Sequence, residues 1–320
     1  MVMSQFHFVF ASLTVCQSVA FSVETRRSLL RPWHRHEDSP ILGWCEEKKI
    51  VEEDLLKVSV GLHSPKENNE DDEEILNFSL PCSRDGGSLS SSIWPAGIAA
   101  SILLWSPSFR SISKNKAVLE LGSGLGISGM VAAVESASCI LTDYDEEATS
   151  RMRAVWERNG NDRLAAKMSI RELDWRDNHS DESPVDIVVG SDIAYYFHLL
   201  RPIMDTTKAF LKERESLFMA VGQANRESQW DLYYNLRDGC YNQLTDKKEP
   251  PWPGNTYMLL YRLDMSRWCK DAEDVQKPEN CEGVIPIAVL VHETEGFHLD
   301  PFTSEDHTAT QEDDDNTLKL

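Results

Sequence analysis

The fold of this chain is decided by one stretch of twelve residues, Val118-Leu119-Glu120-Leu121-Gly122-Ser123-Gly124-Leu125-Gly126-Ile127-Ser128-Gly129. It begins as a short apolar strand with one carboxylate, continues with glycine at every second position, and ends in an apolar segment that predicts a helix. Such a loop brings the main chain against a ligand without an intervening side chain. We therefore expect a strand–loop–helix unit with a ligand site at the loop; a tight turn without a ligand is the alternative.

The residues around the loop indicate which ligand it takes. Gly124 to Gly129 matches the G-x-G-x-x-G pattern of dinucleotide sites, a match with little specificity on its own. A carboxylate at Glu120 would repel a pyrophosphate, whereas S-adenosylmethionine has no phosphate and carries an ammonium and a sulfonium. Glu120-x-Gly122-x-Gly124-x-Gly126 therefore predicts an S-adenosylmethionine site and disfavours a nicotinamide oxidoreductase.

A second buried strand supports this site. Residues 137–142 are mostly apolar and end at Asp143, about 20 residues beyond the glycines, where an acid is placed to accept hydrogen bonds from both ribose hydroxyls. Asp145 is the second candidate for that role. An N-cap for the helix that begins near Glu146 is the alternative function of Asp143.

From Lys116 onward, apolar strands alternate with helices. The expected strands are Val118–Leu121, Ser138–Thr142, Met168–Leu173, Val185–Ser191 and Leu217–Val221. The expected helices are Ile127–Ala137, Glu146–Asn159, Phe197–Lys212 and Glu227–Arg237. This order predicts an α/β fold, a parallel sheet covered by helices on both faces, with ligands at the carboxyl ends of the strands. Four acids lie at those ends: Glu120, Asp143, Asp174 and Asp192.

The regions on either side of this core carry further elements. Residues 55–60 and 75–80 alternate and predict a β-hairpin on either side of a solvated acidic loop, residues 66–74, in an N-terminal extension, residues 41–92. Trp94–Trp105 predicts an apolar helix with Pro95 in its first turn. Thr256–Leu263 and Val284–His292 are expected to form an antiparallel pair at the sheet edge. We assign residues 93–300 to the main domain and residues 301–320 to an acidic disordered tail.

The composition indicates which partners and cofactors the chain is expected to bind. The formal net charge is −21, which argues against nucleic acid as a partner and suits a basic protein substrate. Seven scattered cysteines without a C-x-x-C pair, and a single close histidine pair, His34 and His36, predict no metal site.

The first 40 residues predict a targeting leader. The apolar run from Phe6 to Cys16 is too short to span a bilayer, and an arginine-containing stretch follows Phe21. This order resembles the bipartite plastid presequence of algae with secondary plastids; a leader without function is the alternative. We accordingly expect a cytoplasmic or a plastid location, and a monomer without stable membrane insertion.

With these residues placed, the chain resembles the seven-stranded protein-lysine methyltransferases of the methyltransferase-like family (lysine methyltransferase family 16 type). The resemblance covers roughly residues 92–263, in a mostly parallel seven-stranded, Rossmann-like class I methyltransferase fold. The matching segments are Ser92–Gly97 with its tryptophan, the glycine loop, Leu141–Tyr144, Leu173–Trp175, and the D-x-x-Y pattern of Asp192 to Tyr195. Two departures are Val155, where the family usually has an asparagine, and the poor match after residue 236.

The resemblance implies roles for particular residues. A neutral lysine amine would attack the methyl carbon of the sulfonium in line, with Asp192 attracting and orienting the amine and Tyr195 walling its channel. Asp174 and Trp175 would contact the adenine, and Trp94 would border the methionine end of the cofactor. For Asp192 the alternative is a cap on the helix near Tyr196, and for the aromatic residues it is core packing.

The sequence leaves two other functions open. The acceptor could be a histidine, an arginine or a small amine instead of lysine. The chain could also bind the cofactor as an interaction module without turnover, although intact Glu120, Asp143 and Asp192 argue against this.

Overall fold

The computed structural model describes residues 43–50, 55–62, 75–81, 89–159, 167–223, 226–238, 241–242, 247–248, 255–264 and 284–293. The expected leader at residues 1–40, the acidic run at 66–74 and the tail at 301–320 lie outside these residues.

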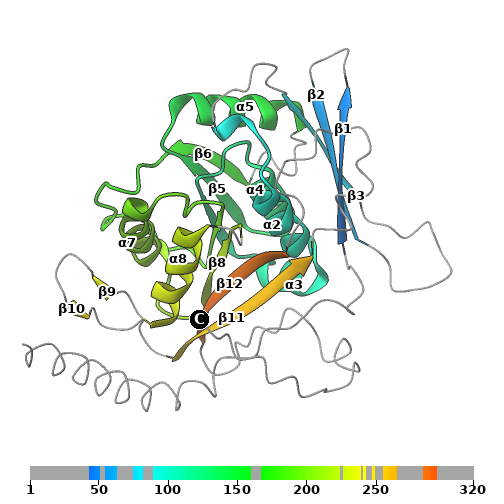
Figure 1. Ribbon diagram of the computed structural model, residues 1–320. Helices are drawn as coiled ribbons and strands as arrows, with labels where there is room; N and C mark the ends of the chain where they lie inside the picture. Colours follow the sequence, from blue (N-terminus) through cyan, green and yellow to red (C-terminus); the bar gives the residue numbers. More distant parts are fainter. Residues whose placement is uncertain are drawn as a thin grey trace, which may run out of the picture.

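A seven-stranded sheet forms the centre of the molecule (Figure 1), in the order β11-β12-β8-β7-β4-β5-β6. The bounds are β4 Ala117–Leu121, β5 Ser138–Asp143, β6 Met168–Glu172, β7 Ile187–Ser191, β8 Ser216–Val221, β11 Asn255–Asp264 and β12 Val284–Glu293. Strands β4 to β8 pair in parallel, and β12 is antiparallel to both β8 and β11. The mostly parallel seven-stranded sheet and its antiparallel edge pair are thus confirmed.

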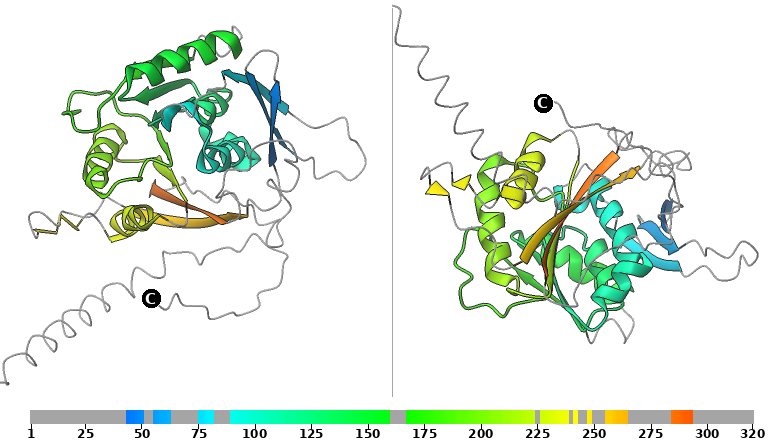
Figure 2. Two further views of the ribbon diagram at one scale, coloured as in Figure 1. Left: turned by 45° about the horizontal axis from the view of Figure 1, so that its top comes forward. Right: turned by 90° about the horizontal axis from the view of Figure 1, so that it is seen from below.

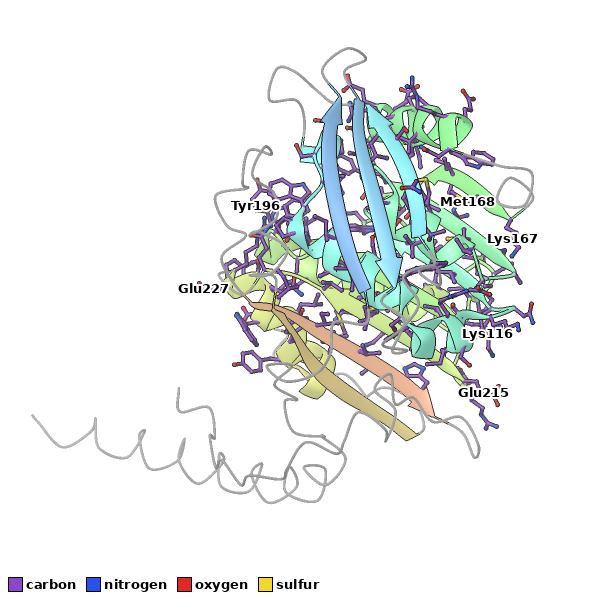
Figure 3. All side chains as sticks on the ribbon, turned by 90° about the vertical axis from the view of Figure 1, so that its right-hand side faces the viewer. Lys116, Lys167, Met168, Tyr196, Glu215 and Glu227 are labelled. Carbon is purple, nitrogen blue, oxygen red and sulfur yellow. The ribbon has the colours of Figure 1, made fainter. Side chains whose placement is uncertain are left out.

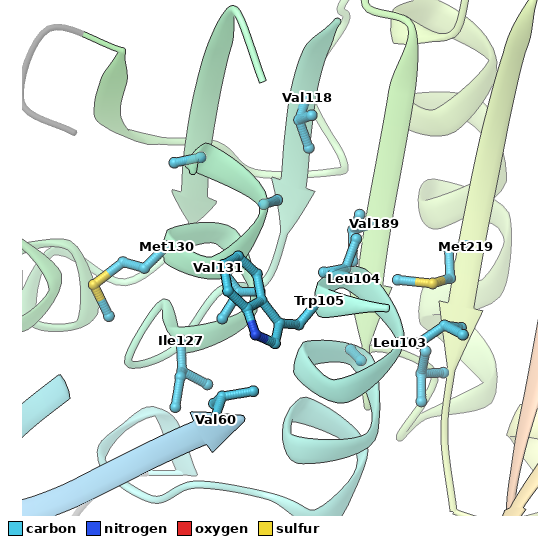
Figure 4. Packing of buried hydrophobic residues seen from close by; sticks show 14 of the residues in the cluster. Val60, Leu103, Leu104, Trp105, Val118, Ile127, Met130, Val131, Val189 and Met219 are labelled. Carbon is cyan, nitrogen blue, oxygen red and sulfur yellow. The ribbon is translucent and has the colours of Figure 1, made fainter. Parts of the chain in front are cut away.

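Helices cover both faces of this sheet (Figure 2). On one side lie α2 (Pro95–Trp105), α4 (Ile127–Ala133) and α5 (Glu146–Asn159), and on the other α7 (Leu200–Phe210) and α8 (Glu227–Asp238). Because strand side chains alternate between faces, Val118 and Met219 join the first core cluster while their neighbours Leu119 and Phe218 join the second. Figure 4 shows Trp105 in the first cluster among α2, α4 and the sheet.

A three-stranded antiparallel sheet, not a two-stranded hairpin, forms the N-terminal extension. Its strands are β1 (Gly43–Ile50), β2 (Leu55–Leu62) and β3 (Ile75–Pro81), with β2 in the middle. The β2–β3 pair was expected, but β1 was not, because its consecutive charges Glu46 to Lys49 break any apolar alternation. Val60, Phe78 and Leu80 join the first core cluster, so this sheet packs on the helices (Figures 3 and 4).

The remaining elements are short. They are the 3₁₀ turns η2 (Leu89–Ser91) and η3 (Phe197–Leu199), helix α3 (Pro107–Ser113), and strands β9 (Tyr241–Asn242) and β10 (Lys247–Lys248). Two expected helices are shorter than predicted: α4 ends at Ala133, and the helix expected from Phe197 begins as η3. Within the described ranges no helix is long and apolar enough to cross a membrane.

The parallel strands place their carboxyl ends on one edge of the molecule. Figure 3 shows Tyr196, which follows β7, and Glu227, which follows β8, on the same edge. Lys116, Lys167 and Glu215, which precede strands, lie on the opposite edge. A site built from the segments that follow the strands is therefore assembled on the Tyr196 edge.

Candidate functional site

The glycine loop between β4 and α4 adopts left-handed backbone at three positions. Gly122, Gly124 and Gly126 have φ of 60°, 54° and 78°, a region that side chains with a Cβ rarely occupy. The loop is fixed to β5, because the Ser123 amide donates to the Thr142 carbonyl at 2.8 Å and the Thr142 hydroxyl donates to the Glu120 carbonyl at 2.7 Å. The alternate glycines are therefore a conformational requirement of this turn.

A pocket of about 360 Å³ lies beside the loop, on the edge where the parallel strands end. We call it the rim pocket. Seven residues predicted for the site line it: Trp94, Gly122, Gly124, Asp143, Trp175, Asp192 and Tyr195. The other lining residues are Ser90, Tyr144, Asp145, Ile193 and Arg226. Segments up to 136 residues apart in sequence thus meet at one cavity, as the topology predicts.

Asp143 ends β5 and holds the glycine loop from the side of the pocket. One carboxylate oxygen accepts the Gly124 amide at 3.1 Å, and the other accepts the Asp145 amide at 3.3 Å. Burial raises the pKa of Asp143, and these amides oppose that rise by stabilising the ionised form. Each carboxylate oxygen has a further lone pair, so Asp143 can still accept hydrogen bonds from a ligand in the rim pocket.

Asp192 has two carboxylate oxygens in different situations. Its Oδ2 accepts from Gln223 Nε2 at 3.1 Å and lies 3.2 Å from Arg226 Nη2, whereas its Oδ1 is buried without a hydrogen-bond partner among the described residues. Burial raises the pKa of Asp192, and Arg226 and Gln223 oppose the rise. Among the described residues η3 has no side-chain cap, and Asp192 binds Gln223 instead, so the capping alternative finds no support.

Asp192 also carries an unusual backbone, with a φ of 57° that few residues other than glycine adopt. Such strained positions are concentrated at functional sites.

Tyr195 is half-buried at the pocket wall, with its ring centroid 4.9 Å from that of exposed Tyr196. Burial raises the pKa of the Tyr195 phenol, so the ring lines the pocket as a neutral group at physiological pH.

Three predicted residues do not line the rim pocket. Glu120 is fully buried beneath the loop, where its carboxylate accepts from the Ser128 hydroxyl and from the Gly129 amide at 3.0 Å. Burial raises its pKa to about 7. Glu120 therefore does not lie at the pocket mouth, where we expected it, because the Ser128 hydroxyl and the Gly129 amide of α4 hold its carboxylate in the protein interior.

Gly126 and Asp174 also lie away from the cavity. A Cβ at Gly126 would stand 2.6 Å from Leu141 Cδ2, which makes this glycine a packing requirement. The Asp174 carboxylate binds its neighbour Arg176, with Nε to Oδ1 at 2.8 Å, and Arg176 lowers the pKa of Asp174. The adenine contacts of this segment remain a prediction, and Trp175 is its member that lines the pocket.

Arg226 is the lining residue that sequence reasoning missed. It stands just before α8, 34 positions after Asp192, and belongs to no motif with it. The pairing of β7 with β8 brings the two segments together. The available signal was positional, since a cation that follows a strand of the parallel sheet falls on the ligand edge.

Comparison with known proteins gives a consistent assignment. A family model described as lysine methyltransferase matches residues 75–235, just over half of the chain. The chain is 24% identical over 181 residues to protein N-lysine methyltransferase METTL21A of Xenopus tropicalis, covering 54% of this chain and 82% of that protein.

Two further relatives match a smaller part of their own length. Identity to calmodulin-lysine N-methyltransferase of Arabidopsis thaliana is 28% over 114 residues, covering 33% of this chain and 38% of the relative. Identity to histone-arginine methyltransferase METTL23 of Xenopus laevis is 30% over 147 residues, covering 44% of this chain and 59% of the relative.

Proposed function

This chain belongs to the lysine methyltransferase family, and from that membership we propose that it methylates lysine side chains of a protein substrate. The cofactor is S-adenosylmethionine. The observation that carries the proposal is the rim pocket, which is lined by the glycine loop, by the strand-end acid Asp143 and by Asp192, whose buried Oδ1 has no hydrogen-bond partner among the described residues.

The residues of the rim pocket fit S-adenosylmethionine. Gly122 and Gly124 present bare main chain to the cavity, and a Cβ at Gly122 would stand 3.1 Å from both Ile193 and Trp175. Asp143 would accept hydrogen bonds from the ribose hydroxyls, and the apolar ring of Trp175 would contact the adenine. Trp94 would border the methionine end of the cofactor.

Glu120 supports this site indirectly. Its carboxyl group anchors the first turn of α4 from beneath and so fixes the loop whose main chain lines the pocket. The electrostatic preference for the cationic cofactor then comes from Asp143 and Asp145, because the guanidinium of Arg226 compensates the charge of Asp192.

The cofactor supplies an electrophilic methyl group on a sulfonium. The protein has to present a neutral amine to that methyl group, although a free lysine amine has a pKa of about 10.4. The rim pocket removes water from the amine and places it near Arg226, and both effects favour its neutral form. Asp192 Oδ1 accepts a hydrogen from the amine and orients the nitrogen lone pair toward the methyl carbon. Tyr195 excludes water beside it.

The first experiment tests which amino acid accepts the methyl group and whether Asp192 takes part in the transfer. Purified protein is incubated with methyl-labelled S-adenosylmethionine and a cell extract, and labelled proteins are identified by mass spectrometry and amino-acid analysis. We expect methyl-lysine, and we expect Asp192→Asn to lose roughly 100-fold or more in transfer, the range of a positioned proton acceptor, while binding the cofactor like the wild type in calorimetry.

The matched control is Asp181→Asn, which removes an exposed carboxylate outside the pocket. It should transfer methyl groups at the wild-type rate. Label recovered as methyl-arginine or methyl-histidine would refute lysine as the acceptor, and full transfer by Asp192→Asn would exclude Asp192 from the reaction.

A further inference from the structure

The two oxygens of Asp192 are not equivalent, and this asymmetry has a structural cause. Both protein donors near the carboxylate, Gln223 Nε2 and Arg226 Nη2, contact Oδ2, at 3.1 and 3.2 Å. Oδ1 receives neither and is buried, in a side chain that is 6% exposed. A buried carboxylate oxygen without a donor is costly, so its position calls for a donor that arrives with a ligand.

Arg226 is well placed to fix this arrangement. It lines the rim pocket, its side chain is 25% exposed, and its guanidinium carbon lies 5.7 Å from the ring centroid of Trp94. The tryptophan on one side and the carboxylate on the other restrict where the guanidinium can lie. Gln223 is buried on the segment after β8 and contacts the same oxygen from a second direction.

We propose that Arg226 is a positioning residue which, together with Gln223, holds Oδ2 of Asp192 and thereby reserves Oδ1 for the substrate amine. The inference rests on the proposed function and assigns one atom of the site to the acceptor. Arg226 also has a second effect. Its positive charge compensates the negative charge of Asp192, so the acceptor end of the pocket has no net attraction for an ammonium ion. The neutral amine, which is the nucleophile, is favoured over its protonated form.

The groups that face Asp192 define the expected pH behaviour. They are Arg226 and Gln223 from the segment after β8 and Tyr233 from α8, while Tyr195 and Asp143 line the same pocket. Arg226 is the only cation among them, within the described residues. Without it, burial would raise the pKa of Asp192 further, and a bound amine would keep its proton to higher pH. Both changes raise the pH at which methyl transfer reaches half of its maximum rate.

The experiment compares the wild type with Arg226→Gln, which removes the charge, and Arg226→Lys, which keeps it. Arg201→Gln is the matched control, since Arg201 forms a similar pair with Asp205 on α7, 2.7 Å between Nε and Oδ2, outside the pocket. Thermal melting confirms that each variant is folded. The readouts are label transfer to cell-extract protein between pH 6 and pH 10, and NMR binding of n-butylamine, a lysine side-chain probe, with S-adenosylhomocysteine present.

For Arg226→Gln we expect the half-maximal pH of transfer and of n-butylamine binding to lie about 1 unit higher than in the wild type, the shift typical of a lost neighbouring charge. Arg226→Lys and Arg201→Gln should keep the wild-type midpoint. Coinciding midpoints for Arg226→Gln and the wild type would overturn the proposal. Failure of the wild type to bind n-butylamine or to transfer label would instead count against the proposed function.

Discussion

At the scale of single residues, the two buried carboxyl groups of Glu120 and Asp192 have different functions. Glu120 has donors for both of its oxygens and stabilises the glycine loop from beneath. Asp192 lines the rim pocket and, among the described residues, has donors for only one of its oxygens. The chemistry of a carboxylate is the same in both cases, so its partners decide whether it has a structural or a catalytic function.

Glu120 gives the protein a pH-dependent stability. The pKa of Glu120 is about 7 in the folded protein, above its ordinary value of 4.5. Between these two pH values the folded state therefore keeps a proton on Glu120 that the unfolded state has lost. Stability therefore falls as pH rises from about 5 to 8, by about 3 kcal/mol. Glu120→Gln keeps an acceptor for the Gly129 amide but cannot ionise, so urea unfolding at pH 5 and pH 8 should show a smaller difference than in the wild type.

Glu157→Gln is the control for that measurement, since Glu157 is exposed on α5. It should keep the wild-type difference between pH 5 and pH 8. Equal differences in Glu120→Gln and the wild type would mean that Glu120 is ionised throughout this range.

The residue scale also shows what a sequence can and cannot give. Asp143, Asp192, Gly122 and Gly124 lie at the ends of strands within recognisable motifs, and the structure brings these four residues to one pocket. Arg226 belongs to no motif and reaches Asp192 only through the pairing of β7 with β8. The direction of the Glu120 side chain depends on donors eight and nine residues later, which the pattern of glycines does not reveal.

At the scale of elements, Asn159 joins the extension to the methyltransferase core. From the last position of α5 its side chain accepts the Ser79 amide of β3 at 2.6 Å and donates to the Ser79 carbonyl at 2.8 Å. It also donates to the Val155 carbonyl at 2.6 Å. The two bonds to β3 complete the edge of the three-stranded sheet as another strand would.

We expect Asn159→Ala to destabilise the protein by about 1–3 kcal/mol, because two main-chain groups of β3 lose their partner. Hydrogen exchange should become faster for β3 amides and stay unchanged for those of β7. Asn178→Ala is the control, since Asn178 is exposed and, among the residues that the structure describes, its side chain hydrogen-bonds only the nearby Ser180 amide. Unchanged exchange in β3 would show that the core cluster alone holds the extension.

Prediction at this scale succeeded where periodicity was clear. The strands of the parallel sheet alternate with helices, and their order alone indicated the layers. Strand β1 was missed because its pairing with β2 comes from the partner strand and not from apolar alternation of its own. The short helix α3, with three serines in seven residues, has no periodic apolar face either.

At the scale of the whole molecule, β12 is the strand on which the sheet depends. It lies between β8 and β11, and Ile285, Ile287, Val289 and Leu290 on it are buried. Four such side chains at about 2 kcal/mol each approach the whole stability of an ordinary domain. The part of the chain after residue 236, where the family resemblance is poor, therefore contributes an essential part of the core through β12.

A chain that ends after Asp264, and so lacks β12, should not melt cooperatively in circular dichroism, because the edge of β8 is left unpaired. The control is a chain that ends after residue 300, the expected end of the main domain, which should melt like the full chain. A cooperative transition in the shorter chain would show that β12 is dispensable for folding.

The place of β12 between two earlier strands has a consequence for synthesis on the ribosome. β11 leaves the exit tunnel before the strand that must separate it from β8, so the last strand has to be inserted and cannot simply be added at an edge. Until then a nascent chain exposes the apolar edge of β8, where it can pair with other chains. Expression at lower temperature or with more chaperone should therefore increase the soluble yield of this protein.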